Sequence, residues 1–564
     1  MGVGAAIAPQ PALAASFIDG GKTLDNSYVN NVPGNGNYQI TPLLTVGDEV
    51  PLLQGSSLNN LTRVQGQRYA FTGIPDGLGL YTQDLNFNYV FVNHELGGTS
   101  KSDVSTTFPN QQITGSRVSL FQLDKNMNVL GGMNLIGNAI DSTGAPAQPV
   151  SNSSTSTPPG EQLPLTSGIR DAAYNFARFC AGYLAESGFA GGPIWFAPEE
   201  SGNASRGWAV TPNGTAQALD GLGRYSKENV LAAFQYRAGN PSGRTVLLST
   251  EDTNDSEIYL FSGQQTASDP NGFTNGLLYA LKVGNTDFEG QIPNGLNQAT
   301  WTPVDQNAQL DPTGNILSNF VNQPGRTTNF RRLEDIAEDP NNPGTFYVVT
   351  TGTADLPGTD PTNPNTPDTT TAAQAENPYG RLYRFSLNPN DPTGAISNLE
   401  LLLQGGPGNG VSYDNIVVDS NGNVLLQEDE TAFGEQVMLA ENRDAGIFSY
   451  NIASRRVAPL FVLNENAAGT QFNNPNVPGE WETSGIIEVA SNALPGRSSY
   501  LFDVQAHTVT GSTVLNGNHV QGGQLILATP VPEPSSTLGL LLVGGAWGAG
   551  SVLKRKQKTS AKKG

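Results

Sequence analysis

The chain has 564 residues, with 66 glycines, 38 prolines, one cysteine and a formal net charge of −21. This length can bury a large core, and the abundance of turn-forming residues with few amphipathic helical stretches favours an all-β protein. The acidic balance excludes a basic footprint for nucleic acid on the body of the chain, and a single cysteine excludes an intramolecular disulfide and argues against a cysteine-based zinc site.

The N-terminal residues have the pattern of the end of a secretion signal. Ala12, Leu13 and Ala14 form the small-residue motif at which signal peptides are cleaved, and a polar stretch follows. The basic and longer apolar regions that normally precede this motif are missing. We expect residues 1–15 to be the remainder of a signal peptide, with an unstructured alanine-rich start as the alternative.

One stretch shows the structural unit from which the body of the chain is built. In residues 330–353, FRRLEDIAEDPNNPGTFYVVTTGT, Glu334 and Asp335 open a short apolar strand. A turn of Asp, Pro, Asn and Gly follows, and a β-branched and aromatic strand returns. Residues 413–429 repeat this hairpin closely.

Similar apolar strands recur along the chain, and five of the six end in an acid or a histidine. Their irregular spacing argues against a strict repeat array, but it fits a six-bladed β-propeller, in which strand ends converge near a central channel. A large β-sandwich is the alternative, although it gives no reason for acids at the same place in each unit. The strands end near Glu95, Glu199, Glu251, Thr351, Glu428 and His507.

The expected propeller domain covers residues 16–530 and carries long loop insertions. Two low-complexity stretches, residues 140–165 and 354–377, are predicted to be exposed loops. The segment DAAYNFARFCAGYL, residues 171–184, is predicted to form a short helix that carries Cys180. We interpret this cysteine as a small buried apolar side chain.

The recurring acids predict a metal site at the propeller mouth. A single acid in a turn is usually a solvated surface carboxylate, and an acidic excess also serves solubility. Many carboxylates converging on one axis, however, cannot all stay ionised without cations. Calcium prefers such oxygen ligands, with Asn93 and Asn415 as further oxygen donors and His94 and His507 as candidates for a transition metal or proton transfer. The predicted metal ligands are Glu95, Glu199, Glu200, Glu251, Asp252, Glu334, Asp335, Asp414, Glu428 and Asp429.

The C-terminal residues 531–564 resemble a PEP-CTERM sorting signal of Gram-negative bacteria. Val531 is followed by Pro-Glu-Pro, an apolar segment over 537–553 and a basic cluster. The apolar segment lies at the short edge of what spans a bilayer and predicts a transmembrane helix in the inner membrane, with the basic cluster in the cytoplasm. The resemblance implies processing by an exosortase-type enzyme and an exported body at the cell surface or outside the cell; a plain single-span anchor is the alternative.

Several short motifs in order resemble the PhoX-type alkaline phosphatases, exported β-propeller enzymes. The resemblance runs from about residue 70 to 528 and implies a calcium and iron site that binds a phosphate ester. The motifs are GIPDGLG at 73–79, NHELGG at 93–98, WFAPEE at 195–200, RLE at 332–334, YDN at 413–415, QED at 427–429, ETSGII at 482–487, DVQAH at 503–507 and GGQL at 522–525.

By this resemblance, Arg332 and Glu334 are the catalytic candidates. Arg332 corresponds to a residue that clamps phosphate with its guanidinium fork, and Glu334 to a metal ligand. The family's iron-binding cysteine falls on Pro198, which cannot bind a metal, so the resemblance implies the calcium part of the site more firmly than the iron part.

Two functions therefore follow from the sequence. The first is an exported, metal-dependent phosphatase that hydrolyses phosphate monoesters. The second is a non-catalytic, calcium-binding propeller on the cell surface or in the matrix that binds a partner or a glycan. A serine or cysteine hydrolase is disfavoured, because the sequence has no nucleophile elbow motif.

Overall fold

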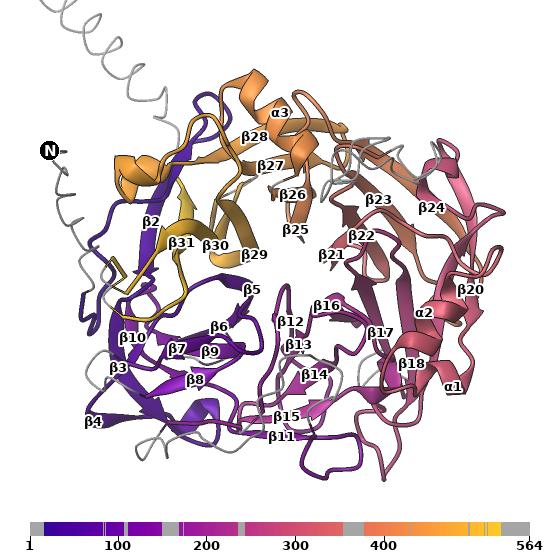
Figure 1. Ribbon diagram of the computed structural model, residues 1–564, viewed down its shortest axis with the longest axis horizontal. Coiled ribbons are helices and arrows are strands. Elements are labelled where there is room, and N and C mark those ends of the chain that lie inside the picture. Colours follow the sequence, from indigo (N-terminus) through magenta and orange to yellow (C-terminus); the bar gives the residue numbers. More distant parts are fainter. Residues whose placement is uncertain are drawn as a thin grey trace, which may run out of the picture.

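The computed structural model shows an all-β protein whose sheets stand around a common centre (Figure 1). It describes residues 16–531, except 83, 85, 106–110, 149–168, 173, 235–242, 353–376, 430, 495–496, 513 and 516. The predicted segment 1–15, the predicted segment 531–564 apart from Val531, and most of the two predicted loop insertions lie outside the described residues. Among the residues that are described, no helix is long and apolar enough to cross a membrane.

The first two sheets follow each other around the ring. The first has the order β4 (Thr62–Ala70), β3 (Glu49–Gln54), β10 (Val129–Asn134), β9 (Arg117–Leu123), β6 (Asn88–His94), β5 (Pro75–Tyr81). The second has the order β11 (Asn138–Ile140), β15 (Thr215–Ala218), β14 (Gly207–Val210), β13 (Ile194–Pro198), β12 (Tyr183–Ala185). A two-stranded ribbon pairs β7 (Lys101–Asp103) with β8 (Gln112–Thr114).

A nine-stranded sheet comes next and consists of two antiparallel meanders joined through β20. The first meander contains β16 (Lys227–Ala232), β17 (Arg244–Glu251), β18 (Ile258–Gln264), β19 (Leu277–Val283) and β20 (Leu296–Pro303). The second contains β21 (Leu333–Glu338), β22 (Thr345–Thr350), β23 (Arg381–Ser386) and β24 (Ile396–Gln404), and β24 pairs with β20.

The last two sheets are completed by strands from the N-terminal part of the chain. One has the order β1 (Val29–Asn31), β28 (Arg456–Leu463), β27 (Gly446–Asn451), β26 (Asn423–Glu428), β25 (Tyr413–Val418). The other has the order β2 (Tyr38–Thr45), β31 (Gln521–Pro530), β30 (Arg497–Thr510), β29 (Glu482–Leu494). Because β2 pairs antiparallel with β31, the two ends of the domain close the ring, which leaves fewer exposed sheet edges.

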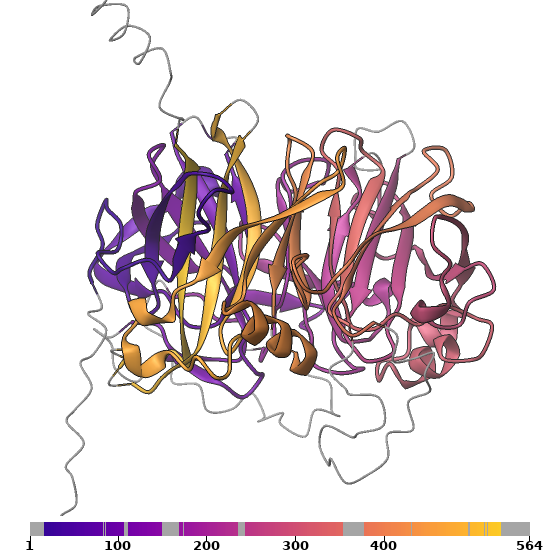
Figure 2. The ribbon, with the colours of Figure 1, turned by 90° about the horizontal axis from the view of Figure 1, so that it is seen from above.

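The helices are short and lie toward one face of the ring (Figure 2). They are α1 (Gln306–Gln309), α2 (Asn315–Val321) and α3 (Ala432–Glu441). The predicted helix over 171–184 is wrong. Backbone bridges from Ser116 to Phe176 and from Phe179 to Glu199 hold this segment against two sheets, so tertiary backbone pairing overrides its helical propensity.

The core fills the spaces within and between the sheets with aliphatic and aromatic side chains. Between the first two sheets, Trp195 of β13 stacks on Phe91 of β6 with ring centroids 5.8 Å apart. A Cβ atom on Gly79 would lie 2.6 Å from the Trp195 ring, so glycine is needed for the close approach of these sheets. The predicted hairpins at 330–353 and 413–429 are confirmed as β21–β22 and β25–β26.

Candidate metal and phosphate site

The edge strands β5, β12, β16, β21, β25 and β29 surround the centre of the ring (Figure 1) and line a cavity of about 450 Å³. In four of them the second residue is a buried acid. These are Asp76 in β5, Glu228 in β16, Glu334 in β21 and Asp414 in β25, each at most 9% exposed. We call these six edge strands the inner strands. Four of them place a carboxylate at the same end of the channel, from four separate places in the sequence.

A β-bulge follows each of these acids. The first residue of the inner strand pairs with the last residue of its neighbour, as Leu333 does with Thr350, and the register then shifts by one residue. The same shift occurs in the β5–β6, β16–β17 and β25–β26 pairs. Because a bulge re-aims side chains, Glu334 joins the acid cluster while the next residue, Asp335, lines the cavity below.

The backbone is strained two positions before four of the cluster residues. The described part of the chain has eight non-glycine residues with positive φ, and half of them occupy this position. Such left-handed conformations are costly for residues with a side chain and concentrate at functional sites. The four are Ile74, Arg178, Arg332 and Ser412, with φ between 48° and 51°, which precede Asp76, Cys180, Glu334 and Asp414.

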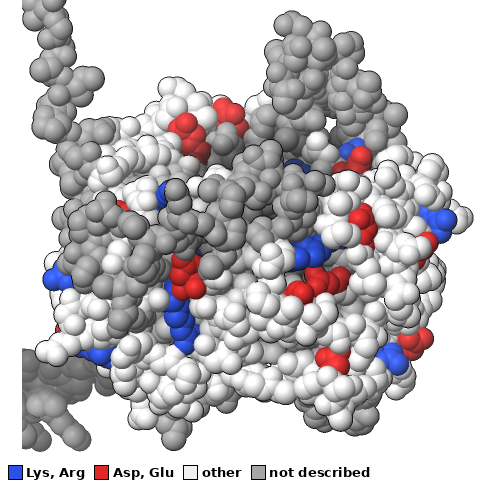
Figure 3. Space-filling model, turned by 60° about the horizontal axis from the view of Figure 1, so that its bottom comes forward, with Lys and Arg blue, Asp and Glu red and all other residues white. Residues whose placement is uncertain are grey.

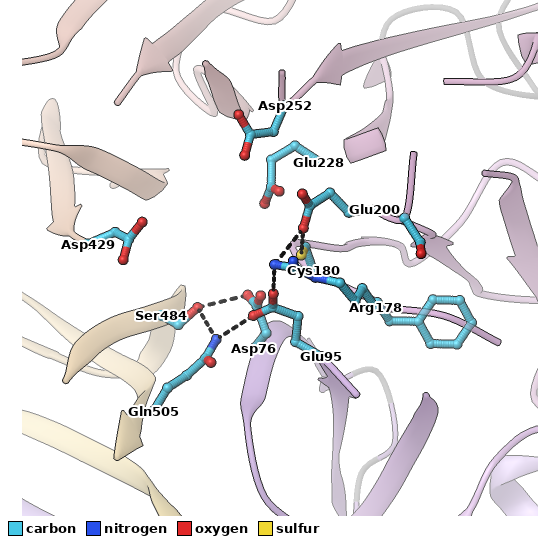
Figure 4. Close-up of polar contacts among 12 residues, drawn as sticks. Asp76, Glu95, Arg178, Cys180, Glu200, Glu228, Asp252, Asp429, Ser484 and Gln505 are labelled. Carbon is cyan, nitrogen blue, oxygen red and sulfur yellow. Dashed lines mark hydrogen bonds and ion pairs between the residues drawn. The ribbon is translucent and has the colours of Figure 1, made fainter. Parts of the chain in front are cut away.

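A continuous cluster of metal-ligating groups occupies the mouth of the channel (Figure 4). Its ligand atoms form three overlapping sets, and within each set they lie within 4.8 Å of one another. The sets are Asp76, Glu95 and Cys180; Cys180, Glu200 and Glu228; and Glu228, Glu334 and Asp414.

Cys180 joins two of these sets and is not merely a packing side chain. Its thiol is buried and donates a hydrogen bond to Oε2 of Glu200 over 2.9 Å. It lies just before β12, on the segment for which a helix was predicted. Pro198, at the position where the resemblance places a cysteine, ends β13 and pairs through its backbone with Gly207. A thiol is thus present at the mouth, but from a different segment.

Two acids of the cluster, Glu95 and Glu200, follow the ends of β6 and β13, each of which is the second strand of its sheet, next to the inner strand. Glu95 and Glu200 both form ion pairs with Arg178, the latter over 3.0 Å (Figure 4). Gln505 donates to Glu95 over 3.2 Å, and Ser484 donates to Asp76 over 2.8 Å. The last sheet therefore contributes an amide and a hydroxyl group, and its inner strand β29 begins with the buried acid Glu482, whose pKa is raised by burial and then by Asp429.

Arg332 lies at the other end of the cluster. Its guanidinium group bonds Asp252 through two nitrogens at 3.2 Å each and lies 3.1 Å from Glu334 and 3.7 Å from Asp429. The predicted residues Arg332, Glu334, Asp252 and Asp429 are therefore brought together. On the face drawn in Figure 3, charged side chains form small separate groups of both signs.

The electrostatics of the cluster favour a bound cation. Burial, and then the neighbouring carboxylates, raise the pKa of the carboxyl groups of Glu228, Glu334 and Asp414 well above the usual range. Burial raises the pKa of Glu200 to about 8, although Arg178 opposes the shift. A cation bound among these groups would favour their ionised form.

Four of the predicted metal ligands have other partners. Glu428 accepts two hydrogen bonds from Arg443, at 2.6 and 2.8 Å, and two from backbone amides. Glu199 accepts from the backbone of Ala177 and Arg206, both at 3.1 Å. Glu251 accepts from Tyr259, and Asp335 from the backbone of Ile416.

The other polar candidates hold parts of the structure together. His94 is buried and contacts Gly73 and Ser119, and burial lowers its pKa to about 3. The Asn93 side chain bonds Cys180 through the backbone carbonyl, Asn415 accepts from Ser484, and His507 bonds Gln521.

Asp76, Glu228 and Cys180 were missed as site residues by the sequence analysis. A signal for two of them was present. Each bulged inner strand starts with an apolar or long side chain, an acid, and then Gly, Asn or Asp, in the triplets PDG (75–77), KEN (227–229), LED (333–335) and YDN (413–415). The acids at the starts of the inner strands, and not only those at the ends of the neighbouring strands, are therefore candidates for the site, and this criterion identifies Asp76 and Glu228.

Comparison with known proteins agrees with this architecture. The model of the family described as alkaline phosphatase PhoX matches residues 208–491, just over half of the chain. The structure of Pseudomonas fluorescens PhoX in complex with vanadate, a transition state analogue, aligns with a TM-score of 0.57 at 15% identity, over 91% of this chain and 98% of that one. This match supports the fold.

Other solved structures are less similar. The α-L-arabinofuranosidase PaAbf62A from Podospora anserina aligns at 12% identity and a TM-score of 0.27, over 62% of this chain and 90% of that one. Cobalt-substituted Synechocystis ACO aligns at 11% identity and a TM-score of 0.29, over 90% and 96%. No curated protein matches the sequence.

The partners of Glu428 predict a structural role. Replacing Glu428 with Gln removes the fully buried carboxylate that binds Arg443 and leaves only the more exposed Glu441, and we expect a loss of about 3 kcal/mol in the free energy of unfolding. Glu441→Gln is the matched control, because Glu441 contacts the same arginine but is more exposed, and should cost under about 1 kcal/mol. Urea unfolding measures both. Equal losses, or loss of bound metal only in Glu428→Gln, would contradict this role.

The raised pKa values predict how the stability of the metal-free protein depends on pH. Between the usual glutamate pKa of 4.5 and about 8 for Glu200, the folded state binds protons that the unfolded state releases. The contribution of these groups to stability therefore falls as pH rises through this window, by up to about 1.4 kcal/mol per pH unit for each such group. Urea unfolding of chelator-treated protein at pH 7 and pH 8 tests this, because both values lie above the ordinary histidine pKa of 6.5, so that buried His94 has little effect on the difference. A stability that is unchanged or higher at pH 8 would show that the cluster is not strained by its own charge.

Proposed function

The chain belongs to the alkaline phosphatase PhoX family, and from this premise we propose that it hydrolyses phosphate monoesters with metal ions bound at the channel mouth. The observation that carries the proposal is the convergence of Asp76, Glu228, Glu334 and Asp414 from four inner strands in three sheets, with Arg332 beside them. Arg332 lies 3.1 Å from Glu334, where its guanidinium group would also meet a phosphoryl oxygen of an ester bound to the metals.

We infer that the ring has six blades. The nine-stranded sheet counts as two blades, because its two antiparallel meanders each begin with their own inner strand, β16 and β21. Together with the four other large sheets this makes six inner strands around the cavity. The number follows from the strand order and matches the six hairpins expected from the sequence.

The donor set fits two kinds of metal ion. Glu228, Glu334 and Asp414 offer only carboxylate oxygens, which suit calcium. The sets around Cys180 combine a thiol with carboxylates, which suits iron better than calcium. We propose calcium at the first position and iron near Cys180. When bound, such ions would polarise the ester and stabilise the negative charge that develops on the phosphoryl oxygens.

The residues of the chain itself would bind and orient the substrate. The Arg332 guanidinium is planar and matches two phosphoryl oxygens at once. Asp252 accepts two hydrogen bonds from the Arg332 guanidinium group, which fix the orientation of that group. The left-handed backbone conformation of Arg332 is the strain expected of a residue held in place for function. The mouth therefore provides a preorganised anion site next to the acid cluster.

We also propose that the protein is exported. The support is in the sequence alone: the cleavage motif before residue 15 and the Pro-Glu-Pro, apolar and basic segments after Val531. Processing by an exosortase-type enzyme, with an inner-membrane anchor before or after it, would release or display the propeller outside the cytoplasm. Calcium is available there, which agrees with the proposed site.

An activity assay tests the proposed function. With calcium and iron supplied, the full chain should hydrolyse a chromogenic phosphate monoester, and chelation should abolish hydrolysis. Arg332→Ala should lower kcat/KM at least about 100-fold through loss of charge-assisted hydrogen bonds, and Glu334→Ala should also lower the metal content. Arg326→Ala, a change at an exposed arginine, is the control. Bound calcium without hydrolysis in the wild type would favour the non-catalytic alternative.

Metal analysis of Cys180→Ser tests the proposed iron position. The substitution removes the thiol but leaves Glu200, Glu228 and the all-oxygen set in place, so iron content should fall while calcium is retained. Loss of a visible thiolate-to-iron absorption band should accompany it. An unchanged iron content in the variant would place iron elsewhere.

A further inference from the structure

Arg178 occupies in the second sheet the position that Arg332 occupies in the nine-stranded sheet. Each arginine lies two residues before a cluster residue, Cys180 in one case and Glu334 in the other. Both have a positive φ, 48° for Arg178 and 51° for Arg332. The same local backbone thus presents a guanidinium group at each end of the cluster.

The side chain of Arg178 reaches into the mouth and remains accessible there. It forms ion pairs with Glu95 and Glu200 (Figure 4), yet 47% of it is exposed, compared with 21% for Arg332. A ligand that enters the mouth can therefore contact it. When a cation neutralises Glu95 and Glu200, these carboxylates hold the guanidinium less strongly, and its remaining N–H groups are available to an anion bound beside the cation.

The backbone around Arg178 is fixed on both sides. Its amide donates to Leu96 and its carbonyl accepts from Glu200, both over 2.8 Å. The Glu199 carboxylate accepts the amide of the preceding Ala177 over 3.1 Å. Arg178 is therefore held by the ends of β6 and β13, as a preorganised binding residue should be, and Glu199 is a positioning residue for it.

We propose that Arg178 is a second phosphoryl-binding residue and that Arg178 and Arg332 bind the substrate phosphoryl group from two sides. This inference rests on the proposed function and deepens it. Two planar guanidinium groups with a metal cluster between them suit a terminal phosphate, which offers three free oxygens and two negative charges. A phosphate diester has one charge and two free oxygens, so the pair selects monoesters.

Substitutions at Arg178 test the proposal in the full-length, metal-loaded protein. In Arg178→Gln, the KM for a chromogenic monoester and the dissociation constant for inorganic phosphate should both rise about 10- to 100-fold, the effect of one lost charge-assisted interaction. The preference for monoester over diester should shrink, while metal content stays at the wild-type value. Arg178→Lys keeps the charge but loses the planar guanidinium group. Its KM and its dissociation constant for phosphate should lie between those of the wild type and those of Arg178→Gln.

Arg63→Gln is the matched control, because its side chain is also 47% exposed and ion-paired, but with Asp19 instead of the cluster. It should leave all of these values unchanged. Phosphate binding by Arg178→Gln within twofold of the wild type would overturn the proposal, and so would loss of bound metal, since Arg178 would then be structural. The dissociation constant for phosphate is measured by titration calorimetry, which does not depend on hydrolysis. If the wild type binds phosphate but does not hydrolyse the ester, the proposed function fails, and the calorimetric comparison of wild type with Arg178→Gln still tests the role of Arg178.

Discussion

Mutual repulsion among buried carboxylates is the constraint on which the site depends. Asp76, Glu228, Glu334 and Asp414 are almost fully buried, and their ligand atoms lie in overlapping sets a few ångströms across. Two arginines, Arg178 and Arg332, offset part of this charge from the ends of the cluster. The remaining negative charge needs protons or cations, and at neutral pH divalent or trivalent cations meet that need best.

The fold is what allows the repulsion to persist. A closed ring, sealed by the pairing of β2 with β31, holds six inner strands around one axis whatever the charges at their ends. The bulge after each acid then separates two consecutive side chains, as with Glu334 in the cluster and Asp335 in the channel. Hydrophobic packing between the sheets, where Trp195 and Phe91 stack, offsets the unfavourable free energy of bringing the acids together.

The sequence predicts more of the fold than of the site. Hairpins with turn residues and β-branched strands are local features, so the all-β class and the units at 330–353 and 413–429 could be recognised. The segment around Cys180 could not, because long-range bridges to Ser116 and Glu199 determine its conformation. For the same reason the resemblance places the family's cysteine at Pro198, although Cys180 approaches the cluster from another segment. Acids such as Glu428 have the same sequence pattern as true cluster members, and only the position of Arg443 distinguishes them.

The most direct test of the account is the anomalous diffraction of crystals of the metal-loaded protein, measured at wavelengths that separate calcium from iron. We predict a calcium peak about 2.3–2.6 Å from carboxylate oxygens of Glu334 and Asp414, and an iron peak bonded to Sγ of Cys180. Absence of any anomalous peak among Glu228, Glu334 and Asp414 in protein that retains phosphatase activity would contradict the claim that these carboxylates converge to bind the catalytic metals.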